Sequence, residues 1–197
     1  MPRRTFRRPQ GDRRYRRLFI IAVEGAKTEP QYFSILNNEL SVIHVKCLDS
    51  RHKSAPQKVL KRMTDYLKDN QLKEMDEAWL VVDKDQWSDD QLLELYQWAN
   101  ENIARGFALS NPNFEYWLLL HFEDGNRLAS HQDCTNRLKR HLPEYNKDIS
   151  SREMTRARVD DAIRRAKQRD NPACVDWPRN MGITTVYRLV EKILRDV

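Results

Sequence analysis

A short apolar run that ends in carboxylates constrains the fold of this chain more than any other stretch. Leu80, Val81 and Val82 are followed at once by Asp83 and, after one further residue, by Asp85. A β-branched run of this length that closes on Asp is typical of a buried strand whose carboxyl end opens into solvent. Open α/β sheets place their chemistry at that end of their strands. The two aspartates therefore form a candidate site.

A second run of the same kind lies earlier in the chain. Residues 18–23 are apolar and are followed by Glu24 and Gly25. If the two strands are neighbours in a parallel sheet, Glu24, Asp83 and Asp85 meet at one edge. Carboxylates this close repel one another and raise each other's pKa values unless a cation lies between them. A hard divalent ion with oxygen ligands, Mg²⁺ above all, would resolve the repulsion.

A carboxylate-bound Mg²⁺ suits phosphodiester cleavage or phosphoryl transfer. The ion can lower the pKa of a bound water and neutralise the phosphate. Glu24 could also serve as general base or acid if burial near the aspartates raises its pKa, and Lys27 could contact the scissile phosphate. The alternative interpretation needs no metal, because Lys27 and Lys84 could instead pair with the carboxylates as structural salt bridges.

Strands and helices are expected to alternate four times between residues 18 and 122, which is typical of a parallel, doubly wound sheet. The sequence therefore predicts an α/β fold of Rossmann-like kind, with a central, mostly parallel sheet of about four strands flanked by helices. The expected strands are 18–23, 42–48, 78–82 and 107–109. Right-handed crossovers would bring the strand ends that carry Glu24, Asp83 and Ser110 to the same edge.

The end of the fourth expected strand allows two interpretations. Ser110, Asn111 and Pro112 form a turn into a helix that spans residues 114–122. Asn111 could cap this helix while Glu115 favours its first turn. In the functional interpretation Glu115 is a further ligand of a metal or a water molecule.

Beyond Gly125 the sequence predicts helices only, over residues 133–142, 154–169 and 184–194. The middle helix is rich in Arg and Lys, which indicates either a solvated face or a nucleic-acid contact. The expected organisation is a basic, disordered arm over 1–17, an α/β core over 18–125, and a helical C-terminal extension over 126–197 packed on the core.

The positive charge of the chain lies in the N-terminal arm. The first 17 residues hold eight arginines and one aspartate, so their net charge of +7 exceeds the +6 of the whole chain and leaves the rest near neutral. Such an arm attracts polyanions through counterion release, and the alternative is an acidic protein partner. The candidate nucleic-acid-binding residues are Arg3, Arg4, Arg7, Arg8, Arg13, Arg14, Arg16 and Arg17.

Other features exclude several classes of protein. Cys47, Cys134 and Cys174 are widely spaced, so neither a zinc site nor a disulfide framework is predicted, and a reducing cytoplasm is the expected location. No apolar run approaches the ~20 residues of a membrane span. Neither a Walker-type phosphate loop nor a Gly-x-Gly-x-x-Gly fingerprint occurs, so nucleotide binding through a glycine-rich loop is not predicted.

Four segments in this order resemble the RloB-like proteins, and together they extend over most of the chain. These segments are Glu24-Gly25-x-Lys27-Thr28-Glu29-Pro30, Asp83-Lys84-Asp85, Ser110-Asn111-Pro112-x-Phe114-Glu115 and Asn180-x-Gly182-x-Thr184-Thr185. The resemblance implies the Toprim fold, in which Glu24, Asp83 and Asp85 would act with Mg²⁺ or Mn²⁺. Glu115 is the candidate for the third carboxylate position of that fold.

The resemblance also implies a setting in bacterial defence against phage, by abortive infection, often beside an ATPase of the ABC type. The leading expectation is a Mg²⁺-dependent Toprim nuclease that cleaves DNA or RNA. The alternative is a non-catalytic Toprim module that acts as an effector, a sensor or a nucleic-acid-binding unit. The oligomeric state is left open.

Overall fold

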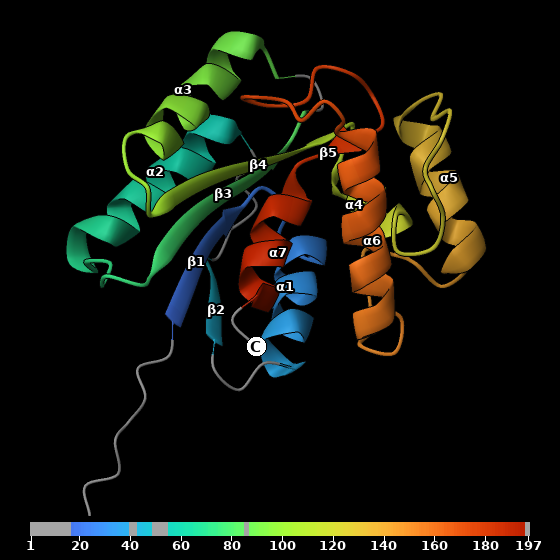
Figure 1. Ribbon diagram of the computed structural model, residues 1–197, viewed down its shortest axis with the longest axis horizontal. Coiled ribbons are helices and arrows are strands. Elements are labelled where there is room, and N and C mark those ends of the chain that lie inside the picture. The colour runs from blue at the N-terminus through green and yellow to red at the C-terminus, as the bar shows by residue number, and fades with distance from the viewer. Residues whose placement is uncertain (1–16, 40–42, 49–54, 85–86, 196–197) are drawn as a thin grey trace, which may run out of the picture.

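The computed structural model describes residues 17–39, 43–48, 55–84 and 87–195 (Figure 1). Asp85 lies outside these ranges, as do residues 1–16 with seven of the eight arginines of the arm. Arg17 is described and is the first residue of a strand, so the arm that the sequence predicts over 1–17 ends at least one residue earlier.

The core of the protein is a five-stranded sheet with the order β2-β1-β3-β4-β5. Strands β1 to β4 are parallel, whereas β5 is antiparallel to β4. The strands are β1 (Arg17–Val23), β2 (Ile43–Leu48), β3 (Glu77–Asp83), β4 (Arg105–Asn111) and β5 (Ile183–Thr184). The α/β, mostly parallel architecture is confirmed. The expectation of helices only beyond Gly125 is wrong, because β5 adds a short fifth strand there.

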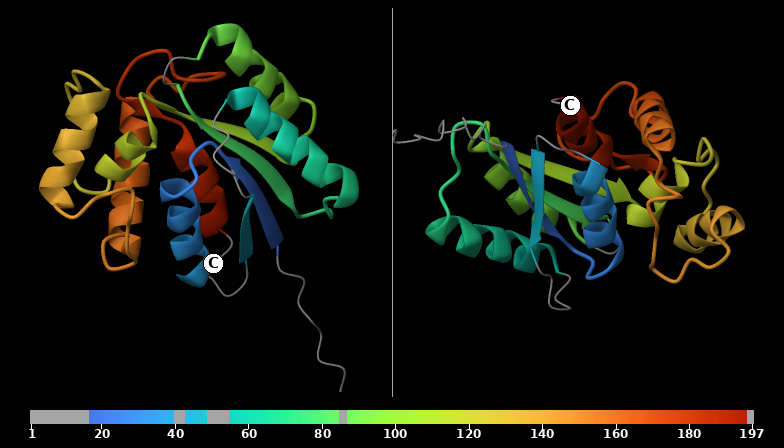
Figure 2. Two further views of the ribbon diagram at one scale, coloured as in Figure 1. Left: turned by 180° about the vertical axis from the view of Figure 1, so that it is seen from behind. Right: turned by 90° about the horizontal axis from the view of Figure 1, so that it is seen from below.

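Helices cover both faces of the sheet (Figures 1 and 2). Helices α2 and α3 lie on one face, and α1 and α7 lie on the other, with α4, α5 and α6 farther along that side. The helices are α1 (Thr28–Glu39), α2 (Pro56–Asp69), α3 (Asp89–Asn100), α4 (Phe114–Leu119), α5 (His131–His141), α6 (Arg156–Arg169) and α7 (Val186–Arg195). No helix in the described part of the chain is long and apolar enough to cross a membrane.

Burial on both faces explains why β1 is apolar at every position after Arg17. Phe19, Ile21 and Val23 pack into the core beneath α1 and α7, whereas Ile20 and Ala22 pack into the core beneath α2 and α3. A parallel strand that is buried on both faces has no solvent side and therefore shows no alternation of polar and apolar residues. This burial fixes the strand and, with it, the position of the carboxylate that follows.

Local capping sets where the helices begin. Ser88 caps α3 and forms a capping box with Gln91. The N-cap of α2 is Ala55, which makes no side-chain capping hydrogen bond, and Pro56 follows it. The Glu153 side chain accepts from the Ser150 backbone and closes a turn, so α6 starts only at Arg156.

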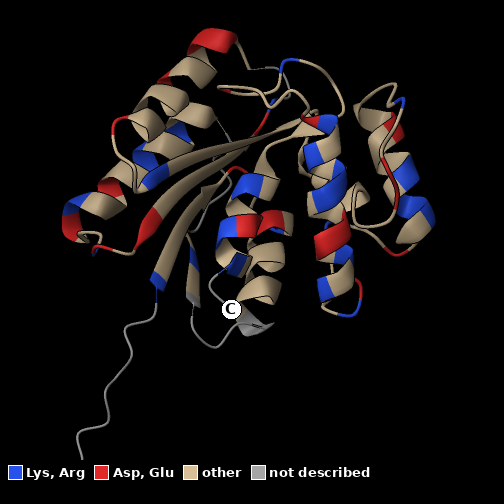
Figure 3. Cartoon of the chain, in the orientation of Figure 1, with Lys and Arg blue, Asp and Glu red and all other residues tan. Residues whose placement is uncertain are grey.

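The cationic side chains of α6 are engaged within the protein. Figure 3 shows acidic residues interspersed among its basic ones. Four ion pairs hold these cations, namely Arg156 with Asp160, Arg164 with Asp161, Arg165 with Asp124 and Lys167 with Glu191. Arg158 donates to the Glu153 carbonyl, and Arg169 donates to the Gly182 carbonyl. These contacts favour the interpretation of α6 as a solvated face whose cations are paired within the protein, rather than as a nucleic-acid contact.

Candidate functional site

The register of the sheet brings the predicted strand ends together. Val23 of β1 lies beside Val81 of β3, and Asp83 of β3 lies beside Ser110 of β4. Because these strands are parallel neighbours, Glu24, Asp83 and Ser110 lie at the same carboxyl edge. The prediction made from the strand order and the right-handed crossovers is thus confirmed for these three residues.

Glu24 is fixed toward Asp83 by hydrogen bonds at both carboxylate oxygens. Its Oε2 accepts from the backbone N–H of Asp83 at 3.2 Å, and its Oε1 accepts from the indole Nε1–H of Trp87 at 3.2 Å. The backbone N–H of Glu24 donates to the Val81 carbonyl at 3.1 Å. These contacts hold the Glu24 carboxylate over the end of β3.

Glu29, which the sequence placed only as a residue that favours a helix start, belongs to the same edge. It lies in the first turn of α1 with 6% of its surface exposed, and its Oε1 accepts from the backbone N–H of Gly25 at 2.8 Å. A Cβ atom at position 25 would collide with the Glu29 carboxylate. The glycine after Glu24 therefore leaves room for the buried Glu29 carboxylate, which a larger residue would displace.

Glu115 lies in the first turn of α4 and is almost fully buried, with 3% of its surface exposed. It accepts from the Tyr145 hydroxyl at 3.0 Å and from the Asn113 side-chain amide, and it forms an ion pair with Lys147. The N-cap of α4 is Asn113. The expectation that Asn111 caps this helix is wrong, because Asn111 is the last residue of β4 and donates instead to the Arg179 carbonyl.

The carboxylates of this edge act on one another electrostatically. Burial raises the pKa of Asp83 well above its usual value, and the negative charges of Glu29, Glu24 and Glu115 raise it further, while Lys147 opposes them. Burial also raises the pKa of Glu29, with an added contribution from Glu115. The name "acidic edge" is used below for Glu24, Glu29, Asp83 and Glu115. Such mutual repulsion disfavours full ionisation in the absence of a cation.

The two lysines that the sequence suggested as partners of these carboxylates, Lys27 and Lys84, pair with other residues. Lys27 pairs with Asp148 at 2.6 Å, and Lys84 pairs with Asp89 at 2.9 Å. The salt-bridge alternative built on these two lysines is therefore not what the structure shows. Among the described residues, Lys147 forms an ion pair with Glu115; it stands 32 positions from Glu115 in the sequence, and no motif indicated it.

Carboxylate oxygens are the donors that a hard divalent cation prefers, but only part of the predicted donor set lies in the described residues. Glu24 and Asp83 offer carboxylate oxygens from neighbouring strand ends, and Asp85 follows in sequence outside the described residues. Asn113 is 2% exposed, its Nδ2 contacts Glu115, and its Oδ1 has no hydrogen-bond partner among the described residues. Within the same ranges, no group of three or more His, Cys, Asp or Glu side chains has an arrangement that could hold a metal ion.

Arg17 differs from the other arginines predicted to bind nucleic acid. Its guanidinium pairs with Glu77, donates to the Met75 carbonyl at 2.9 Å and lies over the ring of Phe19. It therefore anchors the start of β1. The remaining arginines of the arm lie outside the described residues.

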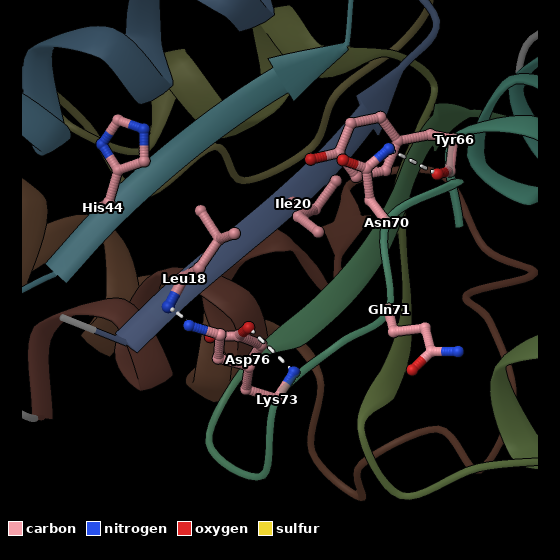
Figure 4. A pocket seen from close by; sticks show the side chains of 8 residues that line it. All are labelled: Leu18, Ile20, His44, Tyr66, Asn70, Gln71, Lys73 and Asp76. Atoms are coloured by element: carbon pink, nitrogen blue, oxygen red, sulfur yellow. Dashed lines mark hydrogen bonds between the residues drawn. The ribbon is translucent and has the colours of Figure 1, made fainter. Parts of the chain in front are cut away.

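A separate cavity of about 440 Å³ opens at the amino-terminal end of β1 (Figure 4). Leu18 and Ile20 contribute apolar side chains to it, and Asp76 lies at its margin, where it accepts from the backbone N–H groups of Leu18 and Lys73. The other lining residues are His44, Tyr66, Asn70, Gln71 and Lys73. This cavity is at the opposite end of β1 from Glu24, so it is not part of the acidic edge.

The fold and the acidic edge define a class of α/β proteins in which a doubly wound parallel sheet gathers carboxylates at the carboxyl ends of neighbouring strands. Residues 19–193 match the family model described as RloB-like protein, so the chain belongs to the RloB-like family. A search of curated proteins and a search of solved structures each found no match.

Proposed function

We propose that this RloB-like protein is a Toprim-type nuclease that uses Mg²⁺ or Mn²⁺ to cleave phosphodiester bonds of DNA or RNA. The observation that carries the proposal is the convergence of Glu24 and Asp83 from the adjacent ends of β1 and β3, with the Glu24 carboxylate bonded to the Asp83 backbone. Carboxylates gathered in this way are suited to a hard cation and, through it, to a phosphate.

In this proposal Glu24 and Asp83 hold the divalent ion together with Asp85. The bound ion would supply a water molecule of lowered pKa and would neutralise the phosphate. Trp87 and the Asp83 backbone orient the Glu24 carboxylate through their hydrogen bonds. Glu24 is then the candidate general acid or base, since its carboxylate is held at the end of β3 by the backbone of Asp83.

The proposal extends to the setting of the reaction. The protein would act in the bacterial cytoplasm, in defence against phage by abortive infection, with an ABC-type ATPase as partner. Membership of the RloB-like family supports this setting, and the basic arm supports a nucleic acid as the substrate.

A non-catalytic Toprim module is the second candidate function. The observation that favours it is the ion pair between Lys147 and Glu115, which supplies the acidic edge with a cation from within the chain. In such a module the carboxylates would be structural, and the protein would act as an effector, a sensor or a binding unit.

One set of assays separates the two candidates. The purified protein is incubated with single-stranded DNA, duplex DNA and RNA, with Mg²⁺, with Mn²⁺ or with EDTA, alone and with an ABC-type ATPase if one is encoded beside it. The nuclease proposal expects cleavage that requires the metal and that disappears in Glu24→Gln. A folded protein that cuts none of these substrates under any condition, and that binds no Mg²⁺ at millimolar concentration, would favour the module.

A further inference from the structure

The cavity at the amino-terminal end of β1, called the amino-end cavity below, lies where α2 leaves one face of the sheet uncovered (Figure 4). Helix α2 packs on this face and ends at Asp69, with Tyr66 in its last turn. Next to that turn, Leu18 of β1 is half-buried, and His44 and Lys46 of β2 are exposed. The hollow is therefore a part of the sheet that the helix does not reach.

Two neighbouring strands supply different side chains to this uncovered face. The register of β1 and β2 places His44 beside Leu18, and Lys46 beside Ile20. Because successive side chains of a strand alternate between the two faces, these four side chains share one face of the sheet. The pair on β1 is apolar and the pair on β2 is basic, so the cavity offers an apolar floor beside polar, cationic groups.

An aromatic ring and two amide groups complete the lining. The Tyr66 ring lies 4.6 Å from the Lys46 ammonium, and its hydroxyl lies 3.3 Å from the same nitrogen. Asn70 is held at the rim, because its Nδ2 donates to the Tyr66 carbonyl at 2.9 Å. Within the part of the chain that the structure describes, the His44 imidazole and the Gln71 amide form no hydrogen bond or ion pair. Both are therefore available to a ligand.

This combination of groups fits a nucleobase. Aromatic side chains, imidazole included, stack on the faces of unpaired bases, while amide and other polar groups bond to their edges. The volume of about 440 Å³ is within the range of pockets that hold small ligands. A base needs both an apolar surface for its ring and polar groups for its edge, and the amino-end cavity provides both.

The basic arm joins the fold at the rim of the amino-end cavity. Arg17 donates to the Met75 carbonyl and pairs with Glu77, the two residues that flank Asp76 in the sequence, and seven arginines precede it in the chain. Asp76 is the only carboxylate among the described lining residues. It is 3% exposed and both its oxygens accept backbone N–H groups, so it faces into the protein. Phosphates drawn to the arm would thus be brought to the cavity.

We infer that the amino-end cavity binds one unstacked nucleobase of a single-stranded nucleic acid, whose phosphates the basic arm attracts. A base inside a duplex is stacked on both faces and cannot enter, so a single strand or a loop is the partner that fits. The seven residues of β1 separate the cavity from Glu24 by roughly 20 Å. The inference therefore goes beyond the proposed cleavage and does not depend on it.

Fluorescence anisotropy of the full-length protein in EDTA tests this inference. A labelled single strand is compared with an abasic strand of the same length and charge, and the wild type is expected to bind the strand with bases about tenfold more tightly. Tyr66→Leu and His44→Ala are each expected to reduce this preference to about twofold, whereas Tyr66→Phe keeps the ring and the preference. Gln71→Ala is expected to weaken binding of the strand with bases. Its matched control is Gln97→Ala, an exposed glutamine of α3 that does not line the cavity.

Photocrosslinking of the wild type gives a readout that needs no variant, in case Tyr66→Leu does not fold. A single strand that carries 5-iodouracil is irradiated with the protein, and the crosslinked peptides are identified by mass spectrometry. The inference expects crosslinks to Tyr66 or His44. Crosslinks found only in other parts of the chain would overturn it.

Isothermal titration with nucleoside monophosphates distinguishes a strand from a free nucleotide as the source of the base. A strand held by the arm predicts no binding of the monophosphates at micromolar concentration. Micromolar binding that Tyr66→Leu abolishes would support the nucleobase site and overturn the strand as its source. Equal affinities of the wild type for the strands with and without bases, or a preference that survives in both Tyr66→Leu and His44→Ala, would overturn the site and leave the nuclease proposal untouched.

Discussion

The Glu24 carboxylate accepts a hydrogen bond from the backbone N–H of Asp83 at 3.2 Å, across the carboxyl ends of β1 and β3. This contact links two strand ends that are separated by 59 positions in the sequence. It places a second carboxylate beside the Asp83 side chain, whose pKa is raised well above normal by burial and then by the charges of Glu29, Glu24 and Glu115. Repulsion at the acidic edge follows directly from this arrangement.

Asp83→Asn is expected to raise the thermal stability of the protein and to lower its nuclease activity. A carboxyl whose folded-state pKa is raised stabilises the protein below its unfolded pKa and loses that contribution as the pH rises through the folded value. At pH 7 the neutral amide removes the repulsion that a charged Asp83 would feel from its neighbouring carboxylates. The melting temperature is therefore expected to rise by about 2–4 °C, which corresponds to about 1 kcal/mol at this chain length. Under the proposed function, nuclease activity is expected to fall at least about 100-fold.

Asp89→Asn is the control for Asp83→Asn. Asp89 is an exposed aspartate in the first turn of α3, and the hydrogen bond from Lys84 lowers its pKa. Its replacement is expected to leave nuclease activity unchanged and not to raise the melting temperature. An Asp83→Asn protein that cuts at the wild-type rate would remove Asp83 from the proposed mechanism. A lowered melting temperature for Asp83→Asn would contradict the repulsion.

Gly25→Ala is expected to disturb the acidic edge through Glu29. The added Cβ would collide with the Glu29 carboxylate, which accepts the Gly25 N–H at 2.8 Å. We expect a loss of about 1–3 kcal/mol in the free energy of unfolding, measured with urea, because a packed buried group has to move. The double change Gly25→Ala with Glu29→Ala removes the collision. It is therefore expected to lower the free energy of unfolding by less than the sum of the losses caused by the two single changes. Strict additivity of the two changes would contradict the contact.

His121 makes the stability of the protein fall as the pH is lowered, whereas Asp83 makes it fall as the pH is raised. It is 2% exposed, its Nδ1 bonds to the Trp117 carbonyl at 3.0 Å and its Nε2 bonds to the Tyr32 hydroxyl at 3.2 Å. Burial lowers its pKa to about 4. The unfolded chain therefore binds a proton that the folded protein does not, and stability is lost as the pH falls from about 6.5 toward 4.

Urea unfolding between pH 7.5 and pH 4 measures this step. The wild type is expected to lose up to about 3 kcal/mol from His121 over that range. His121→Asn is expected to be less stable at pH 7.5 by about 1–3 kcal/mol, because buried partners lose their hydrogen bonds, and to show a smaller decline with acid. His44→Asn is the control, since His44 is exposed. Equal declines in the wild type and His121→Asn would contradict the assignment.

The sequence predicts the sheet and the strand-end carboxylates Glu24 and Asp83 for one physical reason. Strands buried on both faces are continuous apolar runs, so Glu24 and Asp83 stand out at the positions where those runs end. The parallel register then follows from the alternation of strands and helices. Strand β5 has only two residues, too few to give a pattern.

The positions of Glu29 and Lys147 depend instead on long-range packing. Glu29 has the spacing of an ordinary helix-start residue, and only its contact with Gly25 shows that it is buried against Glu24's neighbour. Lys147 belongs to a loop with a left-handed backbone, where neither a helical nor a strand period applies. Lys27 was the natural choice from a local pattern, but Lys27 pairs with Asp148, and Lys147 pairs with Glu115 instead.

Deletion of residues 1–16 is expected to weaken nucleic-acid binding and to flatten its dependence on salt. These residues carry seven arginines, whereas Arg17 is retained because it pairs with Glu77 and begins β1. Each phosphate contact that is lost lowers the slope of log K against log salt by about 0.7–0.9. The measurement is fluorescence anisotropy with a labelled oligonucleotide at several salt concentrations. Arg156→Gln is the control, because that arginine is paired with Asp160. Unaltered affinity and slope at low salt would assign the arm to a protein partner.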